Sequence, residues 1–359
     1  MRPFKAIFLF TCFAVLGTAV WIGFKFKDEK RTVADMFMHT VYTGLFFGQL
    51  SEPEIEVRFD DGTHEEKIVA IRGRLSGLTP DMLDASLFTD LSVPMSDGHV
   101  HNVRMYHPGD YSKEERWKRW PVLLHIHGGG FCIGNYKAND LYLHDLATAA
   151  NVLIFSVSYR FAPEHPFPQA PNDILDHYLW LREHADDYFG DVDRIAVGGD
   201  SAGGNLAVVL THDLRNLARQ GKDVGSVKAQ LINAPVLDGD LNTESYRNYG
   251  KLHGLTKQTM YGFLACYLGV GFEKIKDPRA FPLHGDLSSL PPALMFVYNH
   301  DPLRSEGEAY AEALQREGIP TELHILEGTH VSATIFPYFF HSEQYKTVIH
   351  ASTKMLQSM

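Results

Sequence analysis

The sequence contains few of the residues that mark disulfide-rich or nucleic-acid-binding proteins. Its 359 residues include only three cysteines, Cys12, Cys132 and Cys266. Cys12 lies in the first apolar run, so the folded body has at most one pair, Cys132 with Cys266, and two buried free thiols are an equal alternative. The 33 Lys and Arg are outnumbered by 44 Asp and Glu, giving a net charge of −11. This balance disfavours a nucleic-acid partner or a basic membrane-binding patch.

Sequence patterns typical of metal-binding sites are also scarce. Among 19 histidines, His125 and His127 form an H-x-H pair, but no convincing third ligand accompanies them. No Asn-x-Ser/Thr sequon occurs, so glycosylation gives no indication of compartment, and no internal repeat stands out. We therefore expect neither a metal nor an organic cofactor.

One long apolar run is present near the N-terminus. Residues 6–24, AIFLFTCFAVLGTAVWIGF, carry no charge and approach the roughly 20 residues that a membrane-spanning helix needs. The run is longer than the apolar region of about 7–15 residues in a signal peptide. We predict an uncleaved signal-anchor over 1–30. A cleavable signal peptide, with a small-residue site at 17–19, is the alternative, and it would give a secreted protein.

From residue 95 onward, short β-type runs alternate with amphipathic helical segments. Strands are expected at 103–108, 121–127, 152–159, 194–199, 230–237, 293–299 and 321–326, and helices at about 139–150, 170–187, 202–220, 305–317 and 340–356. This alternation is typical of a mostly parallel sheet with helices on both faces. The range 31–94 is expected to form N-terminal cap helices, in which the apolar and aromatic residues 32–50 form either a helix packed on the core or a lid over a pocket. The range 238–290 lacks a clear strand and is expected to be a cap insertion in the α/β domain over 95–359.

A serine in a glycine-rich turn is the strongest chemical signal. Gly199-Asp200-Ser201-Ala202-Gly203 fits G-x-S-x-G and lies between an expected strand and an expected helix. Such a strained turn needs small neighbours and lifts the serine hydroxyl off the sheet. The following helix also directs its positive end toward the serine. We therefore predict that Ser201 is a nucleophile, the alternative being an ordinary glycine turn.

A run of three glycines follows the expected strand at 121–127. Consecutive glycines are entropically costly, but they allow backbone N–H groups to approach a ligand closely. We predict an oxyanion hole formed by N–H groups of the His127, Gly128, Gly129 and Gly130 loop together with Ala202. A merely flexible loop is the alternative.

A nucleophilic serine needs a base and an orienting carboxylate. Asp301 and His330 each follow an apolar run, in the chain order Ser, Asp, His, where active sites of open α/β sheets lie. We predict His330 as the base and Asp301 as its acidic partner, a role that is compatible with Asp301 also capping a helix. Glu306 is the substitute carboxylate, and His341 is a weaker candidate for the base.

Four stretches in this order, HGGGF, SVSYRFAPEHPFPQAPND, GDSAGG and DPLRSEGEAYA, resemble the hormone-sensitive-lipase family of α/β-hydrolases. The stretch HGGGFCIGN and the N-terminal anchor are most similar to the arylacetamide deacetylase branch of this family. The resemblance to the family covers about residues 95–355. The resemblance implies an α/β-hydrolase fold and a serine carboxylesterase or lipase using Ser201, His330 and Asp301. It implies hydrophobic esters, aryl acetamides or glycerolipids as substrates. It also implies a single-pass anchor in the endoplasmic reticulum with a lumenal catalytic domain.

The sequence departs from this family at three places. Ser305 stands where the family usually has an acidic residue, and Val331 stands where it often has glycine after the catalytic histidine. The late cysteine of the branch is missing, so a bridge to Cys132 does not carry over. These changes bear on activity level and substrate fit more than on the mechanism.

The sequence supports one further structural interpretation and one rival function. The proline-broken stretch YRFAPEHPFP, with Arg160 and Glu164 beside its turn, is expected to be a rigid structural brace below the serine turn. A non-catalytic ligand receptor on the same scaffold is the rival function. Such receptors typically lack one triad member, whereas all three are present here.

Overall fold

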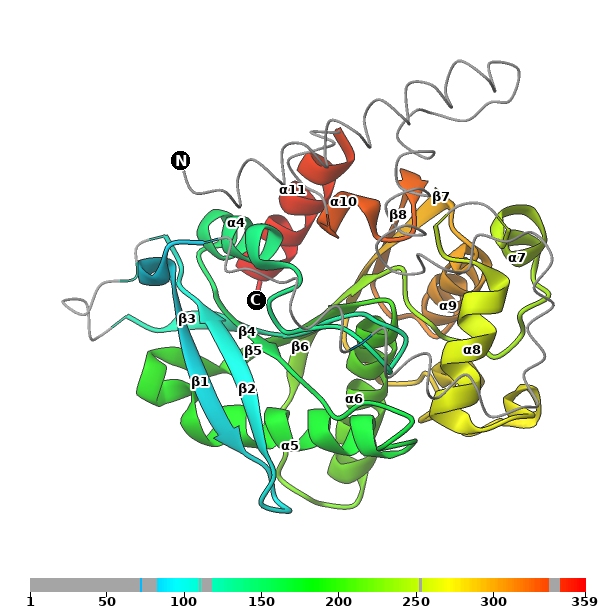
Figure 1. The fold of residues 1–359 in the computed structure, drawn as a ribbon. Coiled ribbons are helices and arrows are strands. Elements are labelled where there is room, and N and C mark those ends of the chain that lie inside the picture. Colours follow the sequence, from blue (N-terminus) through cyan, green and yellow to red (C-terminus); the bar gives the residue numbers. More distant parts are fainter. Residues whose placement is uncertain (1–71, 73–82, 110, 112–117, 252–253, 336–342) are drawn as a thin grey trace, which may run out of the picture.

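A central sheet of eight strands organises the residues that this computed structural model describes, which are 72, 83–109, 111, 118–251, 254–335 and 343–359 (Figure 1). In sheet order the strands are β1 (Phe88–Pro94), β2 (Val100–Tyr106), β4 (Leu153–Val157), β3 (Trp120–Ile126), β5 (Gly190–Asp200), β6 (Val227–Asn233), β7 (Ala293–His300) and β8 (Thr321–Thr329). The pairs β1–β2 and β2–β4 are antiparallel, and all other pairs are parallel. The carboxyl ends of β3, β5, β6, β7 and β8 therefore meet at one edge of the sheet.

Helices cover both faces of this sheet. Helices α4 (Asp140–Ala150) and α11 (Glu343–Gln357) pack together on one face, and α5 (Gln169–His184), α6 (Ala202–Arg219) and α9 (Arg304–Arg316) cover the other (Figure 1). Alternate side chains of each central strand enter the two cores. Leu123, for example, lies in the α4–α11 core, while its neighbour Leu124 lies in the core of α5 and α6. Burial on both faces explains why these strands are almost continuously apolar.

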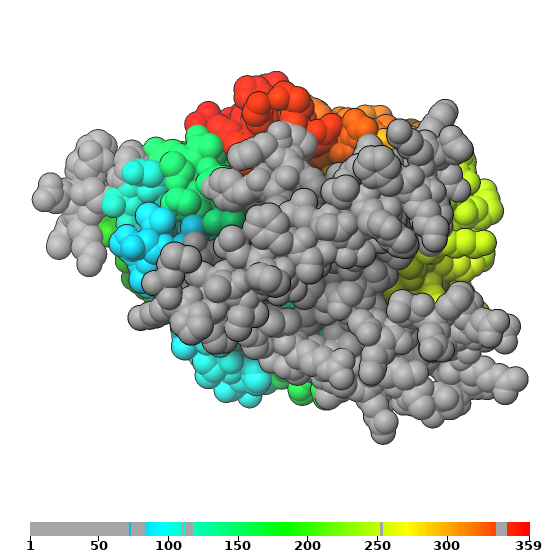
Figure 2. Space-filling view, turned by 45° about the horizontal axis from the view of Figure 1, so that its top comes forward, coloured from blue at the N-terminus to red at the C-terminus, as the bar shows by residue number. Residues whose placement is uncertain are grey.

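The 238–290 segment is helical. It contains α7 (Glu244–Tyr249), α8 (Lys257–Leu268) and two short 3₁₀ helices, η4 (Phe272–Lys274) and η5 (Pro282–His284). Its described residues include no strand. Figure 2 shows yellow-green residues of this segment at one margin of the molecule and red C-terminal residues at another. The remaining short elements are η2 (Ala85–Leu87), η3 (Ala185–Tyr188) and α10 (Ser332–Ile335).

The first strand, β1, was not predicted from the sequence. Its side chains are mostly half-buried or exposed, so FTDLSVP lacks a clear apolar alternation. Asp90 of β1 instead accepts two hydrogen bonds of 2.8 Å from the fully buried Arg104 of β2, whose third bond goes to Asp140 of α4. Residues 88–94 therefore belong to the sheet and not to the cap helices predicted over 31–94. The other predicted strands and helices are present, with ends displaced by a few residues.

The predicted membrane anchor lies outside the described residues. Among the residues that are described, no helix is both long enough and apolar enough to cross a bilayer. Residues 1–30, and residues 31–71 and 73–82 of the predicted cap, carry no structural description.

Candidate active site

Ser201 occupies the sharp turn predicted between strand and helix. It lies between the last residue of β5 and the first of α6, with φ 56° and ψ −118°. A non-glycine residue in so sparsely populated a region stores about 1–3 kcal/mol of strain. The turn is held by Ser201 N–H, which donates to Asn233 O at 2.9 Å, and by N–H groups of Asn205 and Val236, which donate to Ser201 O.

Two glycines of the motif let this turn pack against the end of β3. A Cβ on Gly203 would lie 2.0 Å from Ile126 O and 2.5 Å from His127 O. A Cβ on Gly199 would lie 2.5 Å from Gly203 O and from Ile126 O. No real side chain tolerates such distances. The first turn of α6 therefore rests directly on the strand end that carries the glycine loop.

The glycine loop lies beside the serine, as the oxyanion-hole prediction requires. A Cβ on Gly128 would lie 3.2 Å from Ser201 Cβ. Gly129 and Gly130 have φ of 123° and 59°, a region that favours glycine. Ala202, the remaining predicted donor, is the first residue of α6 and directly follows Ser201. Gly128 and Ala202 thus lie beside Ser201, whereas Gly129 packs against Ile133 O and Gly130 against Phe263.

His127 supports this loop through a neutral side chain. Its Nδ1–H donates to Gly128 O at 2.6 Å, and its ring stacks on Tyr159 with centroids 4.6 Å apart. Burial lowers the pKa of His127 to about 4, so the imidazole is uncharged near neutral pH. No cluster of three or more metal-ligating side chains occurs within the part of the chain that the structure describes.

His330 and Asp301 form a direct pair at the neighbouring strand ends. His330 Nδ1 donates to Asp301 Oδ2 at 2.7 Å, and both side chains are buried. They follow β8 and β7, adjacent parallel strands, which accounts for their meeting. Asp301 Oδ1 also accepts from Leu303 N–H at 2.9 Å, but Leu303 and not Asp301 is the N-cap residue of α9, so Asp301 binds the turn before the helix instead of capping it. Ser201 lies at the same edge, but no hydrogen bond joins its Oγ to His330 Nε2 in this structure.

The two weaker candidates are placed differently. Glu306 does not contact His330; its Oε2 accepts from Asp238 N–H at 3.0 Å, and it is buried behind the Asp301 loop. His341 lies outside the described residues. Asp301 is therefore the carboxylate that orients His330.

A buried polar network behind the serine was not predicted. Asp200 accepts from Asn139 Nδ2 at 2.6 Å and from Asn233 Nδ2 at 2.5 Å, and His125 Nε2 lies 3.3 Å from it. Asn233 Nδ2 also lies 3.0 Å from Thr334 Oγ1, in α10 just after the His330 loop. The serine turn and the histidine loop are thus joined through Asn233. The sequence predicts a strand over 230–237, with Asn233 inside it, and contains no signal of this role.

The unusual residues Ser305 and Val331 each have a structural consequence. Ser305 and Ser245 exchange two hydrogen bonds of 3.1 Å, each backbone N–H donating to the other hydroxyl, which attaches α7 to α9. Val331 is buried and has a φ of 47°, a left-handed conformation that β-branched residues rarely adopt. A glycine would adopt that conformation freely, so Val331 places strain beside His330.

The two cysteines of the folded body are free thiols. Cys132 and Cys266 are both buried, and Cys132 Sγ lies 3.7 Å from Phe263 O of α8. Burial, followed by the neighbouring Cys266 thiol, raises the pKa of Cys132 well above its ordinary value. Of the two alternatives, the structure has the reduced form.

The proline-broken stretch forms three ion pairs, two through Arg160 and one through Glu164. Arg160 binds the buried Asp173 at 2.5 Å and Asp97 at 2.7 Å. Glu164 pairs instead with Arg72, at 2.7 Å. Arg160 thus connects the stretch to α5 and to the turn between β1 and β2, and Glu164 connects it to the chain before the sheet.

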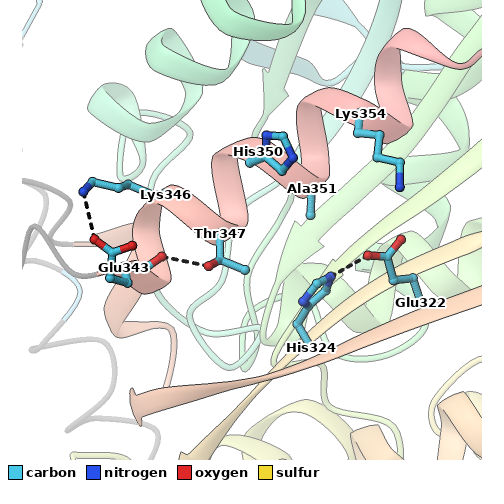
Figure 3. A pocket seen from close by; sticks show the side chains of 8 residues that line it. All are labelled: Glu322, His324, Glu343, Lys346, Thr347, His350, Ala351 and Lys354. Atoms are coloured by element: carbon cyan, nitrogen blue, oxygen red, sulfur yellow. Dashed lines mark hydrogen bonds and ion pairs between the residues drawn. The ribbon is translucent and has the colours of Figure 1, made fainter.

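A separate groove lies away from these residues, between β8 and α11 (Figure 3). It encloses about 440 Å³. Four of its polar side chains form two hydrogen-bonded pairs, His324 with Glu322 and Lys346 with Glu343. None of the predicted site residues lines it, so it is not the candidate active site.

Comparison with known proteins identifies the family. A family model described as alpha/beta hydrolase fold matches residues 123–333. The chain belongs to this family. Its relatives place it among the hormone-sensitive-lipase-like carboxylesterases, which confirms the predicted α/β-hydrolase fold and family. The match includes the glycine loop, Ser201, Asp301 and His330.

Individual relatives of this α/β-hydrolase are bacterial and archaeal esterases. It is 35% identical to an ethyl acetate hydrolase of Pseudomonas putida, over 74% of this chain and 79% of the relative. It is 33% identical to the carboxylic ester hydrolase LipN of Mycobacterium tuberculosis, over 87% and 84%. A solved hyperthermophilic esterase from Pyrobaculum calidifontis superposes with a TM-score of 0.67 at 30% identity, covering 83% and 92% of the two chains. The protein is an enzyme of the carboxylic ester hydrolase class.

Replacing Glu306 with Gln should remove a pH-dependent loss of stability. Burial, reinforced by the charge of Asp238, raises the pKa of Glu306 well above the ordinary 4.5. The folded protein therefore holds this proton more tightly than the unfolded chain, and the wild type loses stability as pH rises above about 4.5. We expect the melting temperature of Glu306→Gln to rise relative to wild type with increasing pH, and the two to run parallel below that value.

Thermal unfolding followed from about pH 4 to pH 8 measures this difference. Glu312→Gln, an exposed change on the same helix α9, is the control. A melting-temperature difference between Glu306→Gln and wild type that stays constant with pH would contradict the assignment.

Proposed function

We propose that this enzyme hydrolyses hydrophobic carboxylic esters through a Ser201–His330–Asp301 triad and an acyl-enzyme. The observation that carries the proposal is the buried 2.7 Å hydrogen bond from His330 Nδ1 to Asp301, at the same sheet edge as the strained serine turn. This bond fixes the imidazole tautomer with Nε2 unprotonated and able to accept a proton. Catalytic hydrogen bonds are often long without substrate, so His330 and Ser201 would meet fully in the substrate complex.

In the proposed mechanism, Ser201 Oγ attacks the ester carbonyl while His330 Nε2 takes the hydroxyl proton. Asp301 stabilises the imidazolium that forms. The tetrahedral intermediate collapses, the alcohol leaves with the proton from His330, and Ser201 stays acylated. Water then attacks the acyl-enzyme, with His330 again acting first as base and then as acid, and the free acid is released.

The negative oxygen of each tetrahedral intermediate would be held by backbone N–H groups of Gly128, Gly129 and Ala202. Gly128 lies against Ser201 Cβ, close enough for its loop to face the attacked carbonyl. The 18-residue helix α6 begins directly after Ser201, so its positive end adds to this stabilisation. Losing one such donor typically lowers kcat by about 10²–10³-fold.

Replacing Ser201 with Ala should abolish hydrolysis of p-nitrophenyl esters in a folded protein. Removal of a serine nucleophile lowers kcat by about 10⁴-fold or more, because the oxyanion donors alone give only weak catalysis. A fluorophosphonate probe should label Ser201 in wild type and leave Ser201→Ala unlabelled. Turnover retained by the variant would rule out this nucleophile, and an unlabelled wild type would favour the rival non-catalytic receptor.

Apolar side chains of α8 beside the glycine loop support a hydrophobic substrate. Phe263 lies against Gly130, where a Cβ would come within 2.3 Å of its ring. Phe131 stacks on Tyr267 with ring centroids 3.9 Å apart. No charged group takes part in these contacts. An apolar acyl or aryl group is therefore the substrate part that this side of the site would accept, as in the arylacetamide deacetylase branch.

A substrate panel should rank uncharged apolar esters first. We expect short p-nitrophenyl esters to have the highest kcat/KM, and an aryl acetamide to be cleaved measurably if the branch is right. A diacylglycerol, tested beside them, separates esterase from lipase activity. Absence of aryl acetamide hydrolysis by an enzyme active on esters would contradict the branch while leaving the esterase intact.

We also propose that residues 1–30 anchor the enzyme to the endoplasmic-reticulum membrane with its catalytic domain in the lumen. The support is the uncharged run over 6–24. The expected result is that the full chain stays with membranes after alkaline carbonate extraction and keeps its N-terminal residues. A soluble protein whose sequenced N-terminus begins after residue 19 would instead indicate the secreted lipase.

A further inference from the structure

One arginine from the chain before the sheet reaches the glycine loop. Arg72 Nε–H donates to Cys132 O at 2.8 Å, Nη2–H donates to Ala162 O at 2.6 Å, and Nη1–H donates to Glu164 Oε1 at 2.7 Å. The guanidinium also lies 5.2 Å from the ring centroid of Phe161. All three nitrogens are therefore engaged, and only the planar fork of arginine can make these bonds together.

The two carbonyl acceptors belong to the segments that hold the glycine loop in place. Cys132 ends the turn that closes on this loop, its N–H donating to Gly129 O at 3.1 Å. Ala162 N–H donates to Phe131 O at 3.0 Å. One backbone hydrogen bond thus joins the two segments, and Arg72 provides a second bridge between them through their carbonyl groups.

The loop needs such support because its glycines do not fix their own conformation. Oxyanion donors are effective only when they are held about 2.7–3.1 Å from the developing charge. We propose that Arg72 is a positioning residue that holds the glycine loop in its oxyanion-binding arrangement. The inference rests on the proposed function, since it assigns the loop the oxyanion role. Arg72 itself does not touch the reacting atoms.

The ion pair between Arg72 and Glu164 is partly exposed, so its effect can be distinguished from that of the two carbonyl bonds. The side chains of Arg72 and Glu164 are 22% and 44% exposed, and partly exposed ion pairs contribute little to global stability. The backbone carbonyl groups of Cys132 and Ala162 are the acceptors that bear on the loop. Losing the two carbonyl bonds should therefore affect transition-state binding, whereas losing only the pair with Glu164 should not.

Four variants test this prediction. Arg72→Met removes the guanidinium donors and keeps an apolar side chain. Arg72→Lys keeps the positive charge, but all of its N–H donors are on one nitrogen. Glu164→Gln removes the ion pair and leaves both carbonyl bonds possible. Arg219→Met is the control, because Arg219 forms a similar surface pair with Asp286, away from the loop. Each is assayed for kcat and KM on p-nitrophenyl butyrate, for Ki of a trifluoromethyl ketone, and for melting temperature.

We expect Arg72→Met to lower kcat by about 10- to 100-fold and to raise the ketone Ki by a similar factor, because the ketone forms an oxyanion on the enzyme. KM should change by less than about threefold. Arg72→Lys should recover part of the loss, and Glu164→Gln and Arg219→Met should stay within about threefold of wild type.

Wild-type kcat and Ki in Arg72→Met would overturn the proposal. A loss of kcat without a change in Ki would also overturn it, since the loop would then bind the oxyanion normally. If Arg72→Met fails to fold, Arg72→Lys decides by the same two parameters. Fluorophosphonate labelling of wild-type Ser201 separates the two proposals. If wild-type Ser201 is not labelled, the proposed function is contradicted. If Ser201 is labelled but the Arg72 variants keep wild-type kcat and Ki, only the positioning role is contradicted.

Discussion

The close backbone contact between α6 and the end of β3 is the constraint on which the site depends. Gly203 and Gly199 allow the helix to start almost in contact with Ile126 O, at distances that no Cβ would permit. This contact brings Ser201, the residue directly before the helix, beside the glycine loop that follows β3. The left-handed strain at Ser201 persists because three backbone hydrogen bonds surround it. The proposed nucleophile and its proposed oxyanion donors are thereby placed together by main-chain packing.

A second constraint supplies the other half of the site. The parallel pairing of β7 and β8 brings Asp301 and His330 together, 29 positions apart in sequence yet joined by a 2.7 Å hydrogen bond. Asn233 then connects the two halves, because its carbonyl accepts from Ser201 and its amide reaches both Asp200 and Thr334. Buried polar groups of this kind must be paired, so each member restricts the position of the next.

The sequence predicted those features that depend on local pattern. Ser201 and the glycine loop were identifiable because G-x-S-x-G and a run of three glycines each follow an expected strand. The buried parallel strands were identifiable because they are almost wholly apolar. Strand β1 was missed because Asp90 sits within it, and only the structure reveals that Arg104 neutralises that carboxylate. The Asp200 network and the contacts of Arg72 were missed for a related reason: they join residues distant in sequence through single side chains, which leave no periodic pattern.

The order of the strands has a consequence for the newly made chain. From β5 to β8, neighbours in the sheet are also successive along the sequence, so this half of the sheet grows outward from the nucleophile. His330 joins the site only when β8 has paired, which is after nearly all of the sheet has been synthesised. A nascent polypeptide that has already formed its serine turn still lacks a base. On the proposed mechanism, the partly folded hydrolase therefore stays inactive during translation until β8 has joined the sheet.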